Sequence, residues 1–317
     1  MIRTFSRTNG NIKIDTVSPD ELAATERGGL LWIDLVNPQH DEILAVERQL
    51  EMELPTRQES EEIEFSARFW EDEKAITINT YFFFRDDQAA VNENISFTLR
   101  ERVLVTTRYS HRRIFEDFTR RLLSSPSAFP DGLYVLAGLL DLRIDMDADI
   151  LEALSKQIVG TGRQNINGVA DHASFLDRVT TFEEINITFR ENLTDKQRVL
   201  SSLLKSPKIP DSMKKEFAIM IKDVNSLITS ANFNFERLDY LQDLFLNFMS
   251  VEQNKVIKIF TVMSVIFLPP TLIASVYGMN FRFLPELDWY FGYPMALILM
   301  ALSAVLPIWI FRKKGWL

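Results

Sequence analysis

Residues 259–281 read IFTVMSVIFLPPTLIASVYGMNF, and residues 289–311 read WYFGYPMALILMALSAVLPIWIF. Neither stretch contains a charged residue, and each is 23 residues long. A helix needs roughly 20 apolar residues to cross the hydrocarbon core of a bilayer, which is about 30 Å thick. The two stretches therefore predict two membrane-spanning helices, joined by a short external loop at residues 282–288.

The charges that flank the two spans predict their orientation. Lysine and arginine lie on the side away from the loop, at Lys255, Lys258, Arg312, Lys313 and Lys314. The loop itself carries Arg282 against Glu286 and Asp288. Because positive charge marks the cytoplasmic side, both termini and the basic tail at 312–317 are expected in the cytoplasm. The start of the chain shows no secretory signal pattern, which agrees with this expectation.

The composition favours hard cations over other partners. The formal net charge of −9 argues against nucleic acid, whose binding needs phosphate neutralisation. The chain has no cysteine and only three histidines, so a soft-metal site is not expected. Arginines between residues 100 and 121 are interleaved with acidic residues, which is typical of a solvated or intersubunit surface. Gly160-Thr161-Gly162 is not a phosphate loop, and no nucleophile arrangement appears, so neither catalysis nor a resident cofactor is expected.

Before the membrane, the pattern predicts three cytoplasmic segments. Residues 1–130 form an α+β (α/β-type) domain, with strands at 30–36, 75–84, 95–99 and 102–107 and a helix at 41–50. Residues 131–209 form a helical hairpin, with helices at 133–158 and 171–204 and a break from Gly160 to Gly168. Residues 210–258 form a long stalk helix, which continues through the first span because no proline or glycine interrupts it before Pro269.

A stripe of mostly polar residues follows one face of this predicted helix in steps of four and three. Its members are Asp243, Asn247, Ser250, Asn254, Ile257, Thr261, Ser264, Leu268, Thr271 and Ser275. Such a face on an otherwise apolar helix predicts a water-filled pore between several copies of the chain. Small hydroxyl residues also allow close packing of membrane helices, and that alternative stays open. Asp243 and Asn254 favour the pore.

Three features of this predicted helix bear on how a pore would close. Ile257 and Leu268 interrupt the polar stripe, and rings of apolar side chains can close a pore by excluding water. Ordinary interface packing is the alternative. Pro269-Pro270 removes two amide donors, which predicts a kink or local unwinding.

The loop after the first span has the chemistry for a hydrated cation. Gly278 is expected to end the helix as a glycine cap that leaves carbonyl groups free at the outer mouth, and Asn280 adds an amide oxygen. Such oxygens suit Mg²⁺, which keeps several of its waters. Glu286 and Asp288 would attract cations to this mouth. Taken alone, the loop could also be a simple turn between two helices.

Several short motifs together resemble the CorA family of magnesium channels. They are Tyr277-Gly278-Met279-Asn280, Leu284-Pro285-Glu286-Leu287, Gly292-Tyr293-Pro294, Lys313-Lys314-Gly315-Trp316-Leu317, Glu252-Gln253-Asn254, Lys258-Ile259-Phe260 and, near the N-terminus, Ser66-Ala67-Arg68-Phe69. The resemblance is strong over the C-terminal part of the chain, whereas the N-terminal half is similar mainly in layout.

The resemblance implies a funnel-shaped homopentamer in a prokaryotic inner membrane, with no enzyme activity. It implies that Gly278, Met279 and Asn280 form the selectivity loop, that Asn254 rings the cytoplasmic pore entrance, and that Ile257, where family members often carry methionine, belongs to the gate. It also implies that Mg²⁺ is both cargo and regulator, with Co²⁺ and Ni²⁺ as further cargo.

The regulatory carboxylates match the family pattern only weakly. Asp86, Asp87 and Asp223 are the nearest candidates, and a solvated surface role is the alternative for each. Two other functions are kept open: a Zn²⁺ transporter of the same superfamily, against which Met279 argues, and a membrane-anchored sensor.

Overall fold

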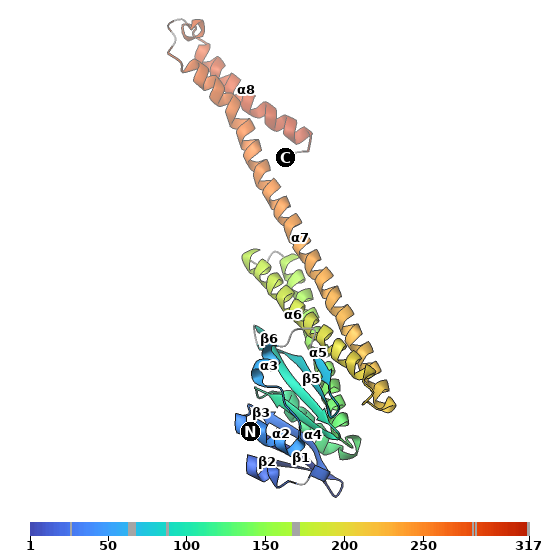
Figure 1. Cartoon of the computed structure of the whole chain (residues 1–317). Coiled ribbons are helices and arrows are strands. Elements are labelled where there is room, and N and C mark those ends of the chain that lie inside the picture. The colour runs from blue at the N-terminus through green and yellow to red at the C-terminus, as the bar shows by residue number, and fades with distance from the viewer. Residues whose placement is uncertain are drawn as a thin grey trace. The chain divides into compact units, whose positions relative to one another are not determined.

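The computed structural model describes residues 1–25, 27–62, 68–86, 89–166, 172–280, 282 and 284–315. These residues form two compact units, Met1–Leu241 and Gln242–Leu317. One helix, α7 (Asp211–Tyr277), contributes residues to both units, as its course in Figure 1 shows. The long unbroken helix expected from the sequence is thus confirmed, and it begins and ends within a residue of the predicted bounds.

The first unit is built on a mixed sheet with the strand order β2-β1-β3-β7-β6-β5-β4. The strands are β1 (Ile2–Thr8), β2 (Asn11–Val17), β3 (Leu30–Val36), β4 (Phe69–Glu71), β5 (Ala75–Asp86), β6 (Ala89–Arg100) and β7 (Val103–Arg108). Strands β3 and β7 pair in parallel, and the other described pairs are antiparallel. All seven residues of β3 are buried, as expected for a central strand covered on both faces.

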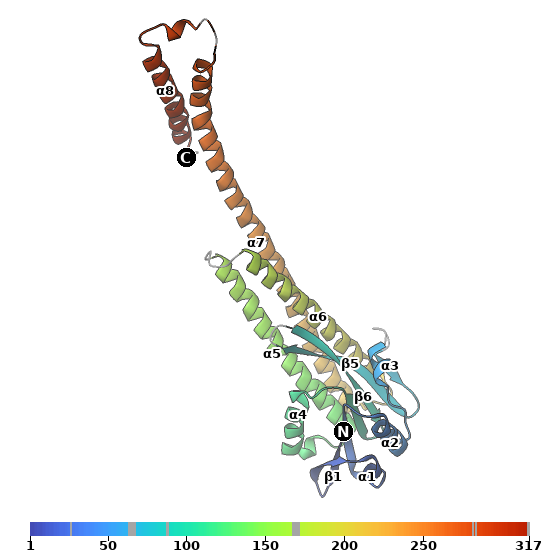
Figure 2. The same cartoon turned by 90° about the vertical axis from the view of Figure 1, so that its left-hand side faces the viewer.

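Helices cover both faces of this sheet (Figures 1 and 2). They are α1 (Pro19–Ala23), η1 (Arg27–Gly29), α2 (His40–Leu50), α3 (Arg57–Glu62), α4 (Arg113–Ser124), η2 (Pro126–Ala128), α5 (Gly132–Ile166) and α6 (His172–Lys205). On one face Val46 and Leu50 of α2 join Ile33 and Leu35 of β3 in an apolar cluster. On the other face an aromatic cluster centres on Trp32, which stacks on Phe5 and meets Phe118 of α4 edge to face.

A buried ion-pair network joins α5 and α6 to strand β5. The carboxylate of Asp147 on α5 accepts a hydrogen bond from Arg143 Nε at 2.9 Å and lies 3.1 Å from the ammonium of Lys196 on α6. Lys196 also donates to the carbonyl of Tyr81 at 3.3 Å, and Asp195 accepts from the hydroxyl of Thr80 at 2.8 Å. The Arg143, Asp147 and Lys196 side chains are 0–2% exposed, so their charges depend on one another for compensation.

Burial lowers the pKa of Lys196 from 10.5 to about 8, while Asp147 acts in the opposite direction. Between these two values the unfolded chain binds more protons than the folded chain, so stability rises as pH rises from 8 to 10.5. We expect this gain to be on the order of 3 kcal/mol. Urea unfolding of the full chain in detergent, followed by circular dichroism, measures it. In Lys196→Met this rise in the free energy of unfolding with pH should be absent. If the free energy of unfolding of the two proteins rose equally between pH 8 and 10.5, the assignment would be wrong.

The first part of α7 packs against α5 and α6 within the first unit. Asn186 on α6 donates to the carbonyl of Ala231 at 2.9 Å, and the hydroxyl of Ser155 on α5 donates to Asn234 at 2.9 Å. Helix α5 does not break at Gly160 as expected but continues to Ile166, and the rest of the predicted break, residues 167–168, lies outside the described residues. A Cβ atom on Gly162 would lie 2.7 Å from Leu241, so this glycine permits close helix packing.

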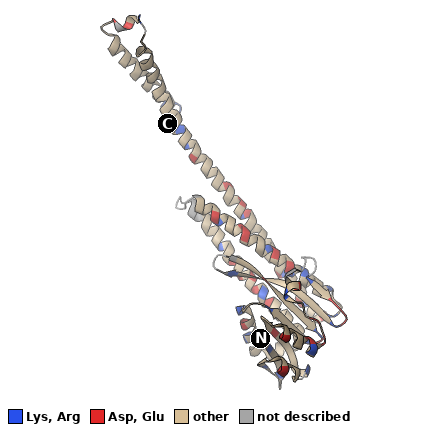
Figure 3. Ribbon diagram, turned by 60° about the vertical axis from the view of Figure 1, so that its left-hand side comes forward, with Lys and Arg blue, Asp and Glu red and all other residues tan. Residues whose placement is uncertain are grey.

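The second unit contains the rest of α7, the turn η3 (Pro285–Leu287) and α8 (Gly292–Lys313). The sequence predicted a kink or local unwinding at Pro269 and Pro270. Helix α7 stays helical through both prolines, so it does not unwind there, and the kink stays a prediction. The two prolines still remove amide donors, which leaves the carbonyls four residues earlier without their usual helical partner. In Figure 3 both apolar helices are tan over most of their length, with acidic residues in the connecting loop and basic residues near the C-terminus.

Candidate functional site

Two described helices, α7 and α8, are long and apolar enough to cross a membrane, with mean hydropathies of 2.0 and 2.2 in their most apolar windows. Within the chain, almost none of either window is buried: 0% of its residues in α7 and 6% in α8. A soluble protein would bury such helices in its core. The exposure of the windows therefore fits helices whose surroundings are lipid and other copies of the chain.

The ten residues of the polar stripe lie on α7 within the second unit, and all ten are exposed. Two hydroxyls of the stripe bond back to their own helix. Thr261 donates to the carbonyl of Ile257 at 2.8 Å, and Thr271 donates to that of Phe267 at 2.7 Å. With its hydrogen used in this way, each hydroxyl turns its remaining acceptor capacity outward. This arrangement suits a face that meets the water shell of a cation.

Helix α7 ends at Tyr277, and the next three residues form the predicted selectivity loop. Gly278 N–H donates to the carbonyl of Ala274 at 2.9 Å, and Met279 N–H donates to that of Val276 at 3.4 Å. The helix end is therefore less open than expected, because two of its last carbonyls are occupied. Gly278, Met279 and Asn280 are all exposed, so the amide of Asn280 is accessible.

Gly278 makes a close approach at this helix end. Its φ is not in the left-handed region, which among the described glycines only Gly10 and Gly315 adopt. A Cβ atom at Gly278 would instead lie 3.0 Å from the carbonyl oxygen of Ala274, tighter than most real contacts. A larger residue here would need the last turn of the helix to shift by a few tenths of an ångström.

The acidic residues of the turn between α7 and α8 lie beside the start of α8. Asp288 is exposed and Glu286 is partly exposed, so their charges reach solvent. A Cβ atom on Gly292 would lie 2.0 Å from the carbonyl oxygen of Glu286, so glycine allows the turn to fold onto the helix. In the described residues, no three acidic or histidine side chains come together to hold a metal ion directly.

Of the three predicted regulatory carboxylates, the structure describes only that of Asp223. Asp87 and the side chain of Asp86 lie outside the described residues, while Asp223 is exposed on α7. Asp223 faces a carboxylate row that sequence reasoning missed, at Asp141, Asp145 and Asp149 on α5. Burial and then the neighbouring carboxylate of Asp141 raise the pKa of Asp145, with smaller contributions from Asp149 and Asp223. The four-residue spacing was the available signal, but it is equally typical of a solvated helix face.

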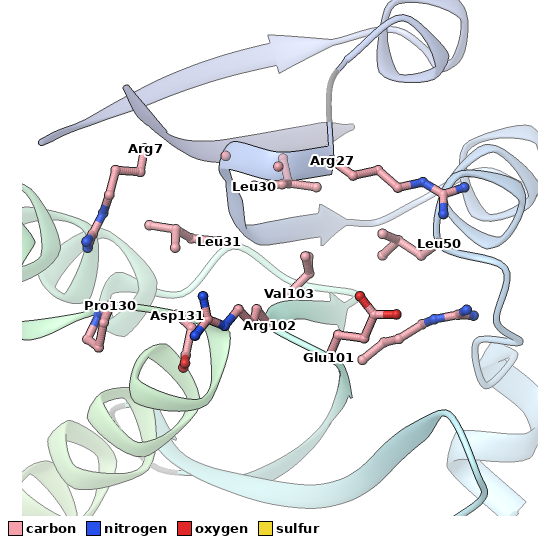
Figure 4. Close-up of a pocket in the computed structure, with 13 residues that line it drawn as sticks. Arg7, Arg27, Leu30, Leu31, Leu50, Glu101, Arg102, Val103, Pro130 and Asp131 are labelled. Carbon is pink, nitrogen blue, oxygen red and sulfur yellow. The ribbon is translucent and has the colours of Figure 1, made fainter. Parts of the chain in front are cut away.

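An arginine-lined cavity of about 500 Å³ lies elsewhere in the first unit (Figure 4). Its arginines are used mainly to hold the fold. Arg7 donates to the carbonyls of Pro126 and Phe129 at 2.7 and 2.6 Å, and Arg27 pairs with Glu51 at 3.3 Å. Among the described residues, none of the predicted ion-pathway residues lines this cavity.

Comparison with protein families decides the identity of the chain. The model of the family described as CorA-like Mg2+ transporter protein matches residues 27–313. The chain belongs to the CorA family. This is a family of ion transporters rather than enzymes, and the resemblance inferred from the loop and tail motifs is confirmed.

Relatives with full-length matches agree with this assignment. The magnesium transport protein CorA of Wolinella succinogenes is 38% identical over 322 residues and is covered completely, as is this chain. That of Campylobacter jejuni is 40% identical over 300 residues, which cover 91% of each chain. The first of these comparisons covers the whole chain and therefore includes both apolar helices and the loop between them.

Solved structures show the same fold. The complete CorA magnesium transporter of Methanocaldococcus jannaschii superposes with a TM-score of 0.84 at 17% identity, covering 100% of this chain and 99% of that one. The full-length CmaX protein gives 0.72 at 13% identity, covering 100% and 98%. The cytoplasmic domain of ZntB from Vibrio parahaemolyticus gives 0.57 at 12% identity, covering 78% of this chain and 97% of that domain. The predicted architecture of an α+β domain, a long helix and two apolar helices is confirmed.

Proposed function

We propose that this CorA-family protein is a channel that carries Mg²⁺ into the cell down its electrochemical gradient. The observation that carries the proposal is the exposed Gly278-Met279-Asn280 loop at the end of a membrane-spanning helix with a polar face. Relatives at 38–40% identity are named magnesium transport proteins, which supports the same cargo. The membrane potential supplies roughly 4.6 kcal/mol per Mg²⁺ at 100 mV, because each elementary charge contributes about 2.3 kcal/mol.

The pore is formed by α7 helices from several copies of the chain, five in the proposed homopentamer. A hydrated Mg²⁺ meets Glu286 and Asp288 first and is then held through its waters by the amide of Asn280. It passes the stripe hydroxyls, which accept hydrogen bonds from its water shell. The same oxygen ligands admit Co²⁺ and Ni²⁺ as further cargo.

Rings of Ile257 and Leu268 close the path when they come together. Both side chains are exposed in the single chain, at 52% and 65%, so they are available to meet their counterparts in other subunits. A narrow apolar ring excludes water and therefore excludes a cation that cannot lose its water shell cheaply. Asn254, one turn before Ile257, provides the polar ring at the cytoplasmic entrance.

Cytoplasmic Mg²⁺ closes the channel in this proposal. The carboxylates of Asp86, Asp87 and Asp223 hold the regulatory ion, and the row on α5 opposite Asp223 adds negative charge to that region. Burial, and then the neighbouring carboxylate of Asp141, raise the pKa of Asp145, and a cation bound nearby would lower it. A filled cell thereby limits its own uptake.

The topology follows from the charge pattern. Segments 1–130, 131–209 and 210–258 are the cytoplasmic domain, hairpin and stalk, and both termini face the cytoplasm of a prokaryotic cell. The spans at 259–281 and 289–311 cross the inner membrane, with the loop at 282–288 outside and the tail at 312–317 inside.

Ion flux into liposomes that contain the purified full chain tests the proposal. With an inside-negative potential, Mg²⁺ influx should exceed that of empty liposomes at least about tenfold, and Mg²⁺ on the cytoplasmic face should suppress it. A matched Asp223→Asn variant should need more cytoplasmic Mg²⁺ for the same suppression.

Three results would contradict the proposal in different ways. Flux of Zn²⁺ without flux of Mg²⁺ would show that the protein is the zinc transporter kept as the alternative. Absence of any divalent flux would favour the membrane-anchored sensor. If cytoplasmic Mg²⁺ left the Mg²⁺ flux unchanged, the proposed channel activity would stand and the proposed regulation by Mg²⁺ would be wrong.

A further inference from the structure

A cavity of about 390 Å³ lies between α7 and α8 in the second unit, near the C-terminal end of α8. It is lined by Lys258, Thr261 and Val262 of α7 and by Phe311 and Gly315 at the end of α8. The lining combines one cationic side chain with apolar ones. Its position next to the basic ends of both membrane helices places it at the cytoplasmic boundary of the proposed spans.

The surroundings of the cavity are strongly basic. The cations of this region are Lys255, Lys258, Arg312, Lys313 and Lys314. The acidic neighbour that pairs with them is Glu252, whose carboxylate is 3.8 Å from Lys255. Lys313 lies over the ring of Trp309, 5.2 Å from its centroid, an arrangement typical of residues at a membrane surface.

Lys258 is the cation inside the cavity. In the part of the chain that the structure describes, its ammonium group forms no hydrogen bond or ion pair. Thr261 already donates its hydroxyl hydrogen to Ile257, so the lysine is the group left to bind an anion. An unpaired ammonium beside apolar surface attracts a ligand with a negative head and an apolar tail.

The end of α8 leaves room for such a ligand. Gly315 has a φ of +67°, and a Cβ atom built on it would meet nothing within 4 Å. Gly315 itself therefore places no side chain over the cavity. Val262 and Phe311 provide apolar walls next to the opening.

We propose that this cavity binds an anionic phospholipid of the cytoplasmic leaflet. The phosphate of the headgroup binds the ammonium of Lys258, and the first part of an acyl chain lies against Val262 and Phe311. Phosphatidylglycerol has this chemistry, whereas phosphatidylcholine has the same phosphate but no net negative charge. The inference rests on the membrane orientation of the proposed function, although the lipid contact itself does not require transport.

Native mass spectrometry of the full chain in detergent tests the site without measuring flux. Detergent micelles lack a charged bilayer surface, so lipid preference reports on the protein. Phosphatidylglycerol should bind at least about fivefold more tightly than phosphatidylcholine, the effect of one favourable charge contact. Lys258→Gln should abolish this preference. Lys255→Gln removes an equal charge from the same helix, outside the cavity, and should retain it.

A second variant separates the cavity from general electrostatics. Val262→Phe fills the apolar part without changing charge, and we expect it to weaken phosphatidylglycerol binding at least about fivefold. Equal losses in Lys258→Gln and Lys255→Gln would overturn the proposal, because charge alone would then explain binding. Displacement of the lipid by millimolar inorganic phosphate would also overturn it, since the acyl contact would be unnecessary.

The other possible occupant of the cavity is a neighbouring copy of the chain. If Lys258→Gln changed the oligomer distribution while lipid binding stayed as in wild type, the cavity would belong to a subunit contact and the lipid site would be wrong. If flux fails but Lys258-dependent lipid binding persists, the proposed transport is wrong and the lipid site stands.

Discussion

Asn280→Ala should reduce Mg²⁺ flux in liposomes by about a thousandfold while the protein still assembles in the membrane. The side chain is exposed directly after the end of α7, and it forms no hydrogen bond within the part of the chain that the structure describes. In the proposed pentamer each hydrated ion meets five amide oxygens. A hydrogen bond contributes roughly 1 kcal/mol, so losing several of them removes most of the binding that competes with bulk water.

The control is Asn232→Ala, which truncates an exposed asparagine on α7, within the first unit. It should transport Mg²⁺ like wild type. Size-exclusion chromatography of both variants reports assembly. Normal flux through a correctly assembled Asn280→Ala protein would mean that another group selects the ion.

Asp147→Asn should destabilise the first unit by about 3–5 kcal/mol. Asp147 is 0% exposed and compensates both Arg143 and Lys196, so its loss leaves two buried cations without an adequate anion. Because a typical domain is stable by only about 5–15 kcal/mol, much of the variant should be unfolded or degraded. Urea unfolding followed by circular dichroism measures the change.

Asp149→Asn is the matched control, since it makes the same change two residues along α5 at an exposed position. It should shift stability by less than about 0.5 kcal/mol. A triple variant, Arg143→Met with Asp147→Leu and Lys196→Met, removes all three charges and should recover much of the loss. If Asp147→Asn were as stable as Asp149→Asn, the network would contribute nothing to the fold.

The membrane part of the chain was the most predictable because its physics is simple. A long apolar run without charges has few structural solutions, and the bounds of α7 match the sequence-based expectation. Strand β3 was also predicted to the residue, since seven consecutive residues that are nearly all apolar suit a strand buried on both faces. The pore and selectivity roles of individual residues stay predictions.

The first hairpin was missed although its turn carried a signal. Asn9 and Gly10 adopt φ values of 51° and 83° between β1 and β2, which is the Asn-Gly turn favoured in tight hairpins. The arginines and threonines of β1 concealed this strand. These polar residues occur in the strand because of contacts with distant parts of the chain. Arg7, for example, donates to the carbonyl of Phe129, and the local sequence does not encode this contact.

The ion-pair network within the first unit could not have been predicted from spacing. Arg143 and Asp147 are four residues apart on a helix, a pattern that usually indicates a solvent-exposed pair. Its burial depends on Lys196, far along the chain, and on the strand beneath both helices. Gly162 was similarly interpreted as a breaker, because the approach of Leu241 is visible only in the folded unit.

The continuity of α7 fixes how the residues of its polar face line up with one another. Each further residue of an α-helix turns the direction of its side chain by about 100°, so steps of four and three keep the stripe on one side. Inserting one residue between Ser250 and Asn254 would therefore turn the later part of the stripe against the earlier part by about a quarter of a circle or more, whereas seven would return it within about 20°. The spacing along this helix, rather than the identity of the residue at each position, keeps the polar face in one line.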